Sequence, residues 1–131
     1  MSDPGAPYHA HIYYTAGTRG AAVALGQRLA AARDSGALPG LFFIGALRDR
    51  AVGPHPVPEF EIHFSHAMLA RVSDLLAASG LTCLVHPLTD DDLADHTTLA
   101  TWIGAALPLK LEVLDAPGHN QGVARFGKSD F

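Results

Sequence analysis

The sequence has few of the residues that would indicate a secreted or membrane protein. It has a single cysteine, Cys83, which rules out an internal disulfide framework and fits a reducing compartment. Cys83 lies in the apolar run 81–85, which favours a buried, inert thiol over a nucleophile. No stretch approaches the roughly 20 apolar residues of a membrane span, and residues 1–5 lack the basic start of a signal peptide. We therefore expect a soluble cytoplasmic protein with no membrane partner.

The sequence also lacks clustered positive charge. Nine Lys and Arg residues stand against 13 Asp and Glu residues, which gives a formal net charge of −4 and a pI near 6.0. The basic residues are scattered, so nucleic acid is not an expected partner. Hydrophobic residues make up 48% of the chain, an ordinary globular proportion. The 131 residues fit a single domain, 1–131, with a core at about 8–114 and flexible tails.

The order of the predicted elements is that of a ferredoxin-like fold. Alternating apolar residues and short apolar runs predict four strands, at 8–14, 41–45, 59–64 and 82–86. Apolar residues at helical spacing predict two helices, at 19–34 and 66–78. The order βαββαβ predicts an α+β domain with an antiparallel sheet of strand order 4-1-3-2 and helices on one face.

Two further elements are predicted beyond this core. Thr89 and Asp92, three residues apart, resemble a capping box, so we expect an extra C-terminal helix from there to about Ile103. Its inner side would carry Leu93 and His96. A short strand is predicted at 109–114, followed by a Gly-rich polar tail.

Histidine is the abundant residue, with eight in 131. His9, His11 and Tyr13 lie on one face of the first predicted strand, because side chains alternate across a strand. Two imidazoles two residues apart can approach one metal ion or one substrate. A polar outer sheet face or a dimer interface would show the same pattern.

The predicted strand order brings more polar side chains to this face. The first strand lies between the third and fourth strands and is antiparallel to both, so its start lies beside their ends. This arrangement places His9 and His11 near His86 and His63, with Glu61 one step along. Two imidazoles and a carboxylate meet the minimum for a non-haem Fe(II) site, and the same set would suit zinc.

Each of these residues also has a purely structural interpretation. His86 precedes Pro87 and could simply end a strand. His63, Glu61 and Glu59 could be solvated residues of the sheet.

Residues outside the strands leave similar alternatives open. His55 lies in a loop with three prolines, which could hold it in place for chemistry or only for a backbone hydrogen bond. His96 could be a histidine of the core, and Trp102 could be a core residue or stack on a substrate. His66 and His119 are expected to have no chemical role.

Several short motifs together resemble one known family. Residues 9–14, 52–56, 85–89, 95–96 and 102–104 read HAHIYY, VGPHP, VHPLT, DH and WIG. Their combination is similar to the small DOPA 4,5-dioxygenase family of extradiol ring-cleaving enzymes, over about residues 8–114. Asp90 stands where a glycine is expected in that family, and Lys110 where an aspartate is common.

The resemblance implies a ferredoxin-like subunit that forms a homodimer. It also implies Fe(II)-dependent insertion of O₂ into a catechol ring, such as that of DOPA or caffeate, beside its two hydroxyl groups. The histidines that match the family motifs are His9, His11, His55, His86 and His96.

These residues lead to a hypothesis for the site. His11 and His86 would hold Fe(II) together with His9 or Glu61, and zinc or another divalent metal could occupy the same site in a crystal. His55, His96 and Tyr13 are the candidate catalytic residues for proton transfer, and His63 and Trp102 are candidates for substrate binding. Two other classes of protein remain open: a non-catalytic dimeric ferredoxin-like module that binds a small ligand or metal, and a cofactor-free monooxygenase of the dimeric α/β-barrel type.

Overall fold

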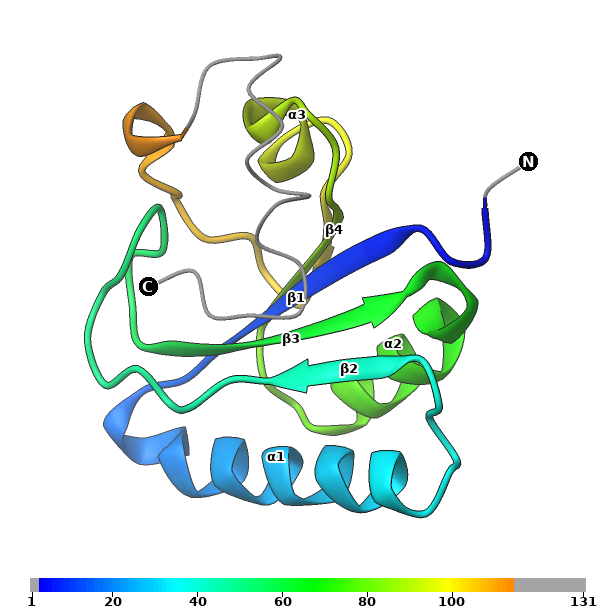
Figure 1. Ribbon diagram of the computed structural model, residues 1–131. Coiled ribbons are helices and arrows are strands. Elements are labelled where there is room, and N and C mark those ends of the chain that lie inside the picture. Colours follow the sequence, from blue (N-terminus) through cyan, green and yellow to red (C-terminus); the bar gives the residue numbers. More distant parts are fainter. Residues whose placement is uncertain (1–2, 115–131) are drawn as a thin grey trace.

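One antiparallel sheet organises the molecule in the computed structural model, which describes residues 3–114 (Figure 1). The five strands are β1 (Pro7–Tyr13), β2 (Leu41–Ile44), β3 (Glu59–Ser65), β4 (Cys83–Pro87) and β5 (Thr101–Ile103). The helices are α1 (Arg19–Asp34), α2 (Leu69–Ala78) and α3 (Asp92–His96), with 3₁₀ turns at Ala16–Thr18, His66–Met68 and Leu111–Val113. The strand order is β2-β3-β1-β4-β5, so the predicted α+β ferredoxin-like fold is confirmed and carries one additional strand.

Strand β1 lies at the centre of the sheet and is antiparallel to both of its neighbours, as predicted. His9 pairs with His63 of β3 on one side and with His86 of β4 on the other. His11 pairs with Glu61 of β3. The main chain therefore brings residues from distant parts of the sequence to one place on the sheet.

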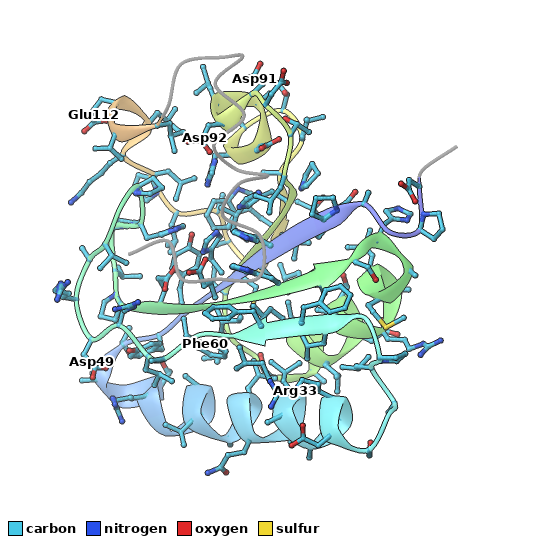
Figure 2. All side chains as sticks on the ribbon, viewed as in Figure 1. Arg33, Asp49, Phe60, Asp91, Asp92 and Glu112 are labelled. Carbon is cyan, nitrogen blue, oxygen red and sulfur yellow. The ribbon has the colours of Figure 1, made fainter. Side chains whose placement is uncertain are left out.

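The face of the sheet toward α1 and α2 is apolar. Ile12, Phe60, Ile62 and Phe64 are fully buried there, and Phe60 projects from β3 toward the helices (Figure 2). The helices supply the opposing side chains at helical spacing: Ala22, Leu25, Leu29, Val72 and Leu76. Burial of this apolar surface is the main source of stability, since each fully buried large side chain contributes about 1.5–3 kcal/mol.

The segment after β4 differs from the prediction. The expected helix to Ile103 ends at His96, and Thr101–Ile103 instead forms β5, which pairs with β4. The exposed edge of β4 offers unpaired backbone groups, and the residues Thr-Trp-Ile favour the strand that satisfies them. Leu93 is 41% exposed, so it does not share the inner side of α3 with His96. The strand predicted at 109–114 is also wrong, because this segment contains the 3₁₀ turn Leu111–Val113.

The start of α3 uses a different cap from the predicted one. Asp91 is the N-cap residue, and its side chain accepts a hydrogen bond from the amide of Ala94 at 3.0 Å. Thr89 instead donates its hydroxyl to the buried carboxylate of Asp95 at 2.6 Å, and the Thr89 amide donates to the other oxygen of Asp95 at 2.9 Å. Together these bonds hold the loop between His86 and His96 in one conformation.

No helix within residues 3–114 has both the length and the apolar character to cross a membrane.

Candidate metal centre

The face of the sheet away from the helices carries histidines and carboxylates. His9, His11, Glu59, Glu61 and His63 project from β1 and β3, and each is at most 4% exposed. His86 joins them from β4 and is 1% exposed. The sequence predicted this gathering of residues from the alternation along the strands, but it did not predict that the residues would be buried.

His11 and His86 face each other through their Nε2 atoms, which lie 3.0 Å apart. The opposite nitrogen of each ring has an oxygen partner. His11 Nδ1 lies 2.9 Å from Oε1 of Glu59, and His86 Nδ1 lies 2.7 Å from the carbonyl oxygen of Pro87. Since a carboxylate and a carbonyl only accept, both Nδ1 atoms carry the proton and donate it. Each Nε2 atom therefore presents a lone pair to the other.

Two lone pairs at this distance repel unless a proton or another cation lies between them. Burial, together with the neighbouring His55 and His86, holds the pKa of His11 well below its ordinary value. Burial and the nearby His96 do the same for the pKa of His86. Because both rings stay neutral near pH 7, the pair has the donor chemistry for a metal ion.

Three overlapping groups of side chains in the described part of the chain have ligand atoms within 4.8 Å of one another. The groups are His9–His11–His86, His9–Glu61–His63 and His11–His55–Glu59. In the second group the rings of His9 and His63 are stacked, with centroids 3.6 Å apart and an interplanar angle of 12°. A metal ion lies near the plane of a ligating imidazole, so two stacked rings are poorly placed to share one ion. Glu61 Oε2 instead accepts a hydrogen bond from His63 Nε2 at 3.2 Å and lies 3.7 Å from His9 Nδ1, beyond hydrogen-bond distance.

His55 lies against the ring of His11, with the ring centroids 4.1 Å apart. Its Nδ1 lies 2.7 Å from the hydroxyl of Tyr13, and its Nε2 lies 3.5 Å from Oε1 of Glu59. In the tautomer of His55 with its proton on Nε2, on the side of the Glu59 carboxylate, Nδ1 accepts the hydroxyl proton of Tyr13. Burial, with a smaller effect of His96, lowers the pKa of His55 to about 3. Burial, with a smaller effect of Glu59, raises the pKa of Tyr13, so both groups are neutral at pH 7.

His96 approaches the cluster from α3. Its ring centroid lies 4.3 Å from that of His86 and 6.2 Å from that of His11. His96 Nδ1 donates to the carbonyl oxygen of Asp92 at 2.7 Å, so in the neutral ring the lone pair lies on Nε2. His96 therefore lies in the cluster and is not an isolated histidine of the apolar core.

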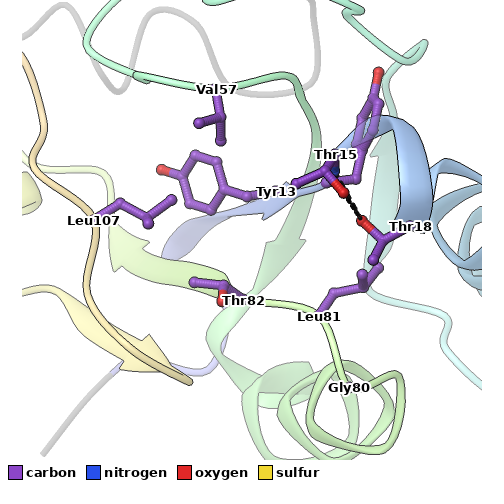
Figure 3. A pocket seen from close by; sticks show the side chains of 9 residues that line it. Tyr13, Thr15, Thr18, Val57, Gly80, Leu81, Thr82 and Leu107 are labelled. Carbon is purple, nitrogen blue, oxygen red and sulfur yellow. Dashed lines mark hydrogen bonds between the residues drawn. The ribbon is translucent and has the colours of Figure 1, made fainter.

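Two cavities adjoin this cluster. One, of about 340 Å³, is lined by His96, Trp102 and apolar residues of the segment 107–111. The other, of about 230 Å³, lies beside Tyr13 and includes Thr82 and Leu107 (Figure 3). The rings of Tyr13 and Trp102 stack with centroids 5.9 Å apart, and Leu107 lines both cavities.

Most of the residues singled out in the sequence are brought together. His9, His11, His55, Glu61, His63, His86 and His96 form one buried cluster, Tyr13 bonds to it, and Trp102 borders the cavity beside it. His66 lies apart, against the ring of Tyr8, and His119 lies outside the described residues. Asp90 and Lys110 are exposed, and the Lys110 amide donates to the carbonyl of Pro54, next to His55.

Glu59 is the residue that sequence reasoning undervalued. The sequence offers Glu61 as a candidate metal ligand and leaves Glu59 as a residue that could be solvated on the sheet. The structure buries it to 1% exposure between His11 and His55. Its place on the same strand face as Glu61 and His63 was the signal that could have identified it.

Comparisons with known proteins identify a family for this chain. Residues 8–113 match the Dopa 4,5-dioxygenase family. The chain is 35% identical over 109 residues to DOPA 4,5-dioxygenase from Amanita muscaria, an alignment that covers 79% of this chain and 47% of the relative. It is 36% identical over 76 residues to an uncharacterised 21.2 kDa protein of Botryotinia fuckeliana, covering 50% of this chain and 42% of the relative. The chain thus spans about half the length of the curated relatives it matches.

A solved structure supports the same assignment. The crystal structure of a proposed dioxygenase from Nostoc punctiforme superposes with a TM-score of 0.67 at 32% sequence identity. The match covers 86% of this chain and 96% of the other. The family match, the curated relative and the shared fold lead to one conclusion: this chain belongs to the Dopa 4,5-dioxygenase family and is a dioxygenase-like protein.

Proposed function

We propose that the protein is an extradiol dioxygenase that uses Fe(II) and O₂ to open the ring of a catechol beside its two hydroxyl groups. The observation that carries the proposal is the pair of Nε2 lone pairs of His11 and His86, which face each other at 3.0 Å inside a buried cluster. The family assignment supports the dioxygenase class. The relative from Amanita muscaria, named for its action on DOPA, supports a catechol as the substrate.

His9, His11 and His86 are the residues we assign to the metal. Their ligand atoms lie within 4.8 Å of one another, and hydrogen bonds already orient the rings of His11 and His86. Three imidazoles leave coordination positions open for a substrate. Iron bound there supplies Lewis-acid and redox chemistry that lets a catechol react with O₂. The same imidazoles suit zinc, so the identity of the metal is part of the proposal.

In this proposal Glu61 is not a metal ligand, although the sequence left that role open to it. Its Oε2 accepts a hydrogen bond from His63 at 3.2 Å and lies 3.7 Å from His9 Nδ1, so its charge favours one orientation of the His9 ring. We place His63 behind His9, on the side of Phe43, whose ring centroid lies 4.6 Å from that of His63. In this proposal His63 supports the site and does not contact the substrate.

The residues around the opening handle the substrate and its protons. Trp102 and Tyr13, stacked on each other beside the cavity, provide an apolar surface for a catechol ring. His96 lines that cavity, and with Nδ1 bonded to the carbonyl of Asp92 its neutral ring has a lone pair on Nε2 that can accept a proton from a catechol hydroxyl. Tyr13 donates its hydroxyl proton to His55. The lone pairs of the Tyr13 oxygen are then available to accept a hydrogen bond from the second catechol hydroxyl and so orient it.

The test uses protein loaded with Fe(II) without air and then mixed with air and DOPA, caffeate or 4-methylcatechol. Extradiol cleavage forms a yellow muconic semialdehyde that contains both atoms of O₂, so we expect new visible absorbance and two ¹⁸O atoms in the product from ¹⁸O₂. No colour with any catechol, together with no stoichiometric metal binding, would refute the enzyme. Metal binding without turnover would favour a binding module, and turnover without metal would favour a cofactor-free monooxygenase.

We also propose that the subunit works as a homodimer, as the family resemblance implies. Light scattering of the purified protein would give its mass in solution. Twice the mass of 13.8 kDa is the expected result, and a value of one chain mass would contradict it.

A further inference from the structure

We propose that Glu59 is a positioning residue that holds His11 in the tautomer whose Nε2 binds the metal. The inference rests on the proposed function and assigns a role to a carboxylate that is not itself needed as a ligand. Glu59 is 1% exposed, and its Oε1 accepts the proton of His11 Nδ1 at 2.9 Å. With the proton fixed on Nδ1, the lone pair of His11 is fixed on Nε2, opposite His86.

The main chain holds the Glu59 side chain in place from two sides. In the sheet register Glu59 pairs with Tyr13 of β1, two residues from His11. On its other side it forms an isolated bridge with Arg48, through amide-to-carbonyl bonds of 2.8 Å and 3.1 Å. A carboxylate on such a rigid base can select one orientation of an imidazole, which a flexible surface carboxylate does not do.

A single oxygen of Glu59 serves two histidines. Oε1 lies 2.9 Å from His11 Nδ1 and 3.5 Å from His55 Nε2. The hydrogen bond from Tyr13 to His55 extends this series of contacts from Glu59 toward the cavity beside Tyr13. Glu59 therefore connects the metal side of the site to its substrate side, and its negative charge increases the electron-donating power of His11.

Replacement of Glu59 by glutamine tests the charge without changing the shape. The amide is neutral and can also donate to Nδ1, which would turn His11 into the tautomer with its proton on Nε2. Loss of such a partner typically costs about 10–100-fold in metal affinity. We therefore expect the dissociation constant for Co(II), read from its visible spectrum, to rise by about 10–100-fold in Glu59→Gln, with a changed ligand-field spectrum.

The tautomer itself is measured by ¹⁵N NMR of the histidine rings in metal-free protein. In the wild type we expect His11 to show a protonated Nδ1 and an unprotonated Nε2. Glu61→Gln is the matched control, since Glu61 lies on the same strand face as Glu59 and contacts His9 and His63. The control should leave the His11 tautomer unchanged, whereas Glu59→Gln should alter it.

The outcomes separate this inference from the proposed function. A wild-type His11 with its proton on Nε2, or a folded Glu59→Gln protein with unchanged Co(II) affinity and spectrum, would overturn the role of Glu59. A wild-type protein that binds no Co(II) would refute the metal centre, while the NMR result would still decide whether Glu59 fixes the tautomer. If Glu59→Gln does not fold, the wild-type spectrum alone decides the question.

Discussion

The two faces of the central strands are equally buried but have opposite chemistry. Ile12, Phe60 and Ile62 on the helix side are 0% exposed, and His11, Glu59 and His63 on the other side are at most 1% exposed. Burial of the apolar face stabilises the fold at about 25 cal/mol per Å². Burial of polar groups costs free energy unless each group has a partner, and it forces the imidazoles to remain neutral. One face therefore maintains the fold, and the other holds reactive groups at the expense of stability.

The largest expected effect is the loss of metal binding and activity when a histidine of the polar face is removed. His86→Ala removes one of the two facing Nε2 atoms, so we expect stoichiometric metal binding and catechol cleavage to fall to background. Metal analysis after dialysis and oxygen uptake measure the two losses. His66→Ala is the matched control, because His66 lies apart from the cluster against Tyr8. Retention of full activity in His86→Ala would contradict the assignment.

A large-to-small substitution on the apolar face should lower the stability of the fold and leave metal binding intact. Phe60→Ala leaves a cavity beneath the sheet, and such a change costs about 3–5 kcal/mol in the free energy of unfolding. Urea denaturation of the metal-free protein measures this loss. Co(II) affinity of the folded fraction should stay close to that of the wild type. A large loss of affinity with little loss of stability would show that the two faces are not separable in this way.

Acid should act on the histidine face alone. The pKa of His55 is lowered to about 3, and those of His11 and His86 are also lowered, so the unfolded chain binds protons that the folded chain does not bind. The stability that depends on these neutral rings is present above an unfolded pKa of about 6.5 and is lost as the pH falls below it. Each ring should cost at most about 2 kcal/mol between pH 6.5 and pH 5.

Unfolding of metal-free protein by urea at pH 7.5 and pH 5 tests this pH dependence. His55→Gln should reduce the loss of stability on acidification, because one of the three rings is gone. Leu29→Ala, on the apolar side, should lower stability by the same amount at both pH values. Equal acid sensitivity in the wild type and His55→Gln would contradict the neutral state of His55.

The smallest expected effect lies at the edge of the apolar face. The hydroxyl of Tyr14 donates to Asp49 at 2.6 Å, and Arg19 of α1 bonds to the same carboxylate at 2.9 Å. Tyr14→Phe should cost about 0.5–1.5 kcal/mol, the usual net value of a hydrogen bond. Arg19→Ala should cost less than about 1 kcal/mol, since exposed ion pairs contribute little. Thermal unfolding measures both, and a larger effect for Arg19→Ala would reverse this order.

The central part of the fold was predictable because period-two alternation assigns a face to every residue of β1 and β3. His11 and Phe60 could be placed on opposite faces from the sequence alone. Residues 89–114 were not predictable in the same way. The run that contains Leu93 and Trp102 fits a helical pattern, and only the free edge of β4, a tertiary feature, favours a strand at Thr101–Ile103.

The composition of the site was predictable, but its internal order was not. The sequence indicated that His11, His86 and Glu61 would meet, because the strand order follows from the order of the elements. It could not rank Glu59 against Glu61, since both alternate onto the same face. Their difference depends on ring orientations: His11 turns its Nδ1 toward Glu59, whereas Glu61 accepts a hydrogen bond from His63.

The most direct test is a crystal structure of the protein loaded with Fe(II), with data collected at the iron absorption edge. The account predicts one anomalous peak per chain, at bonding distance from imidazole nitrogens of His9, His11 and His86, with Glu59 still bonded to His11 Nδ1. A peak held by Glu61 and His63, or by His55 and Glu59, would contradict it.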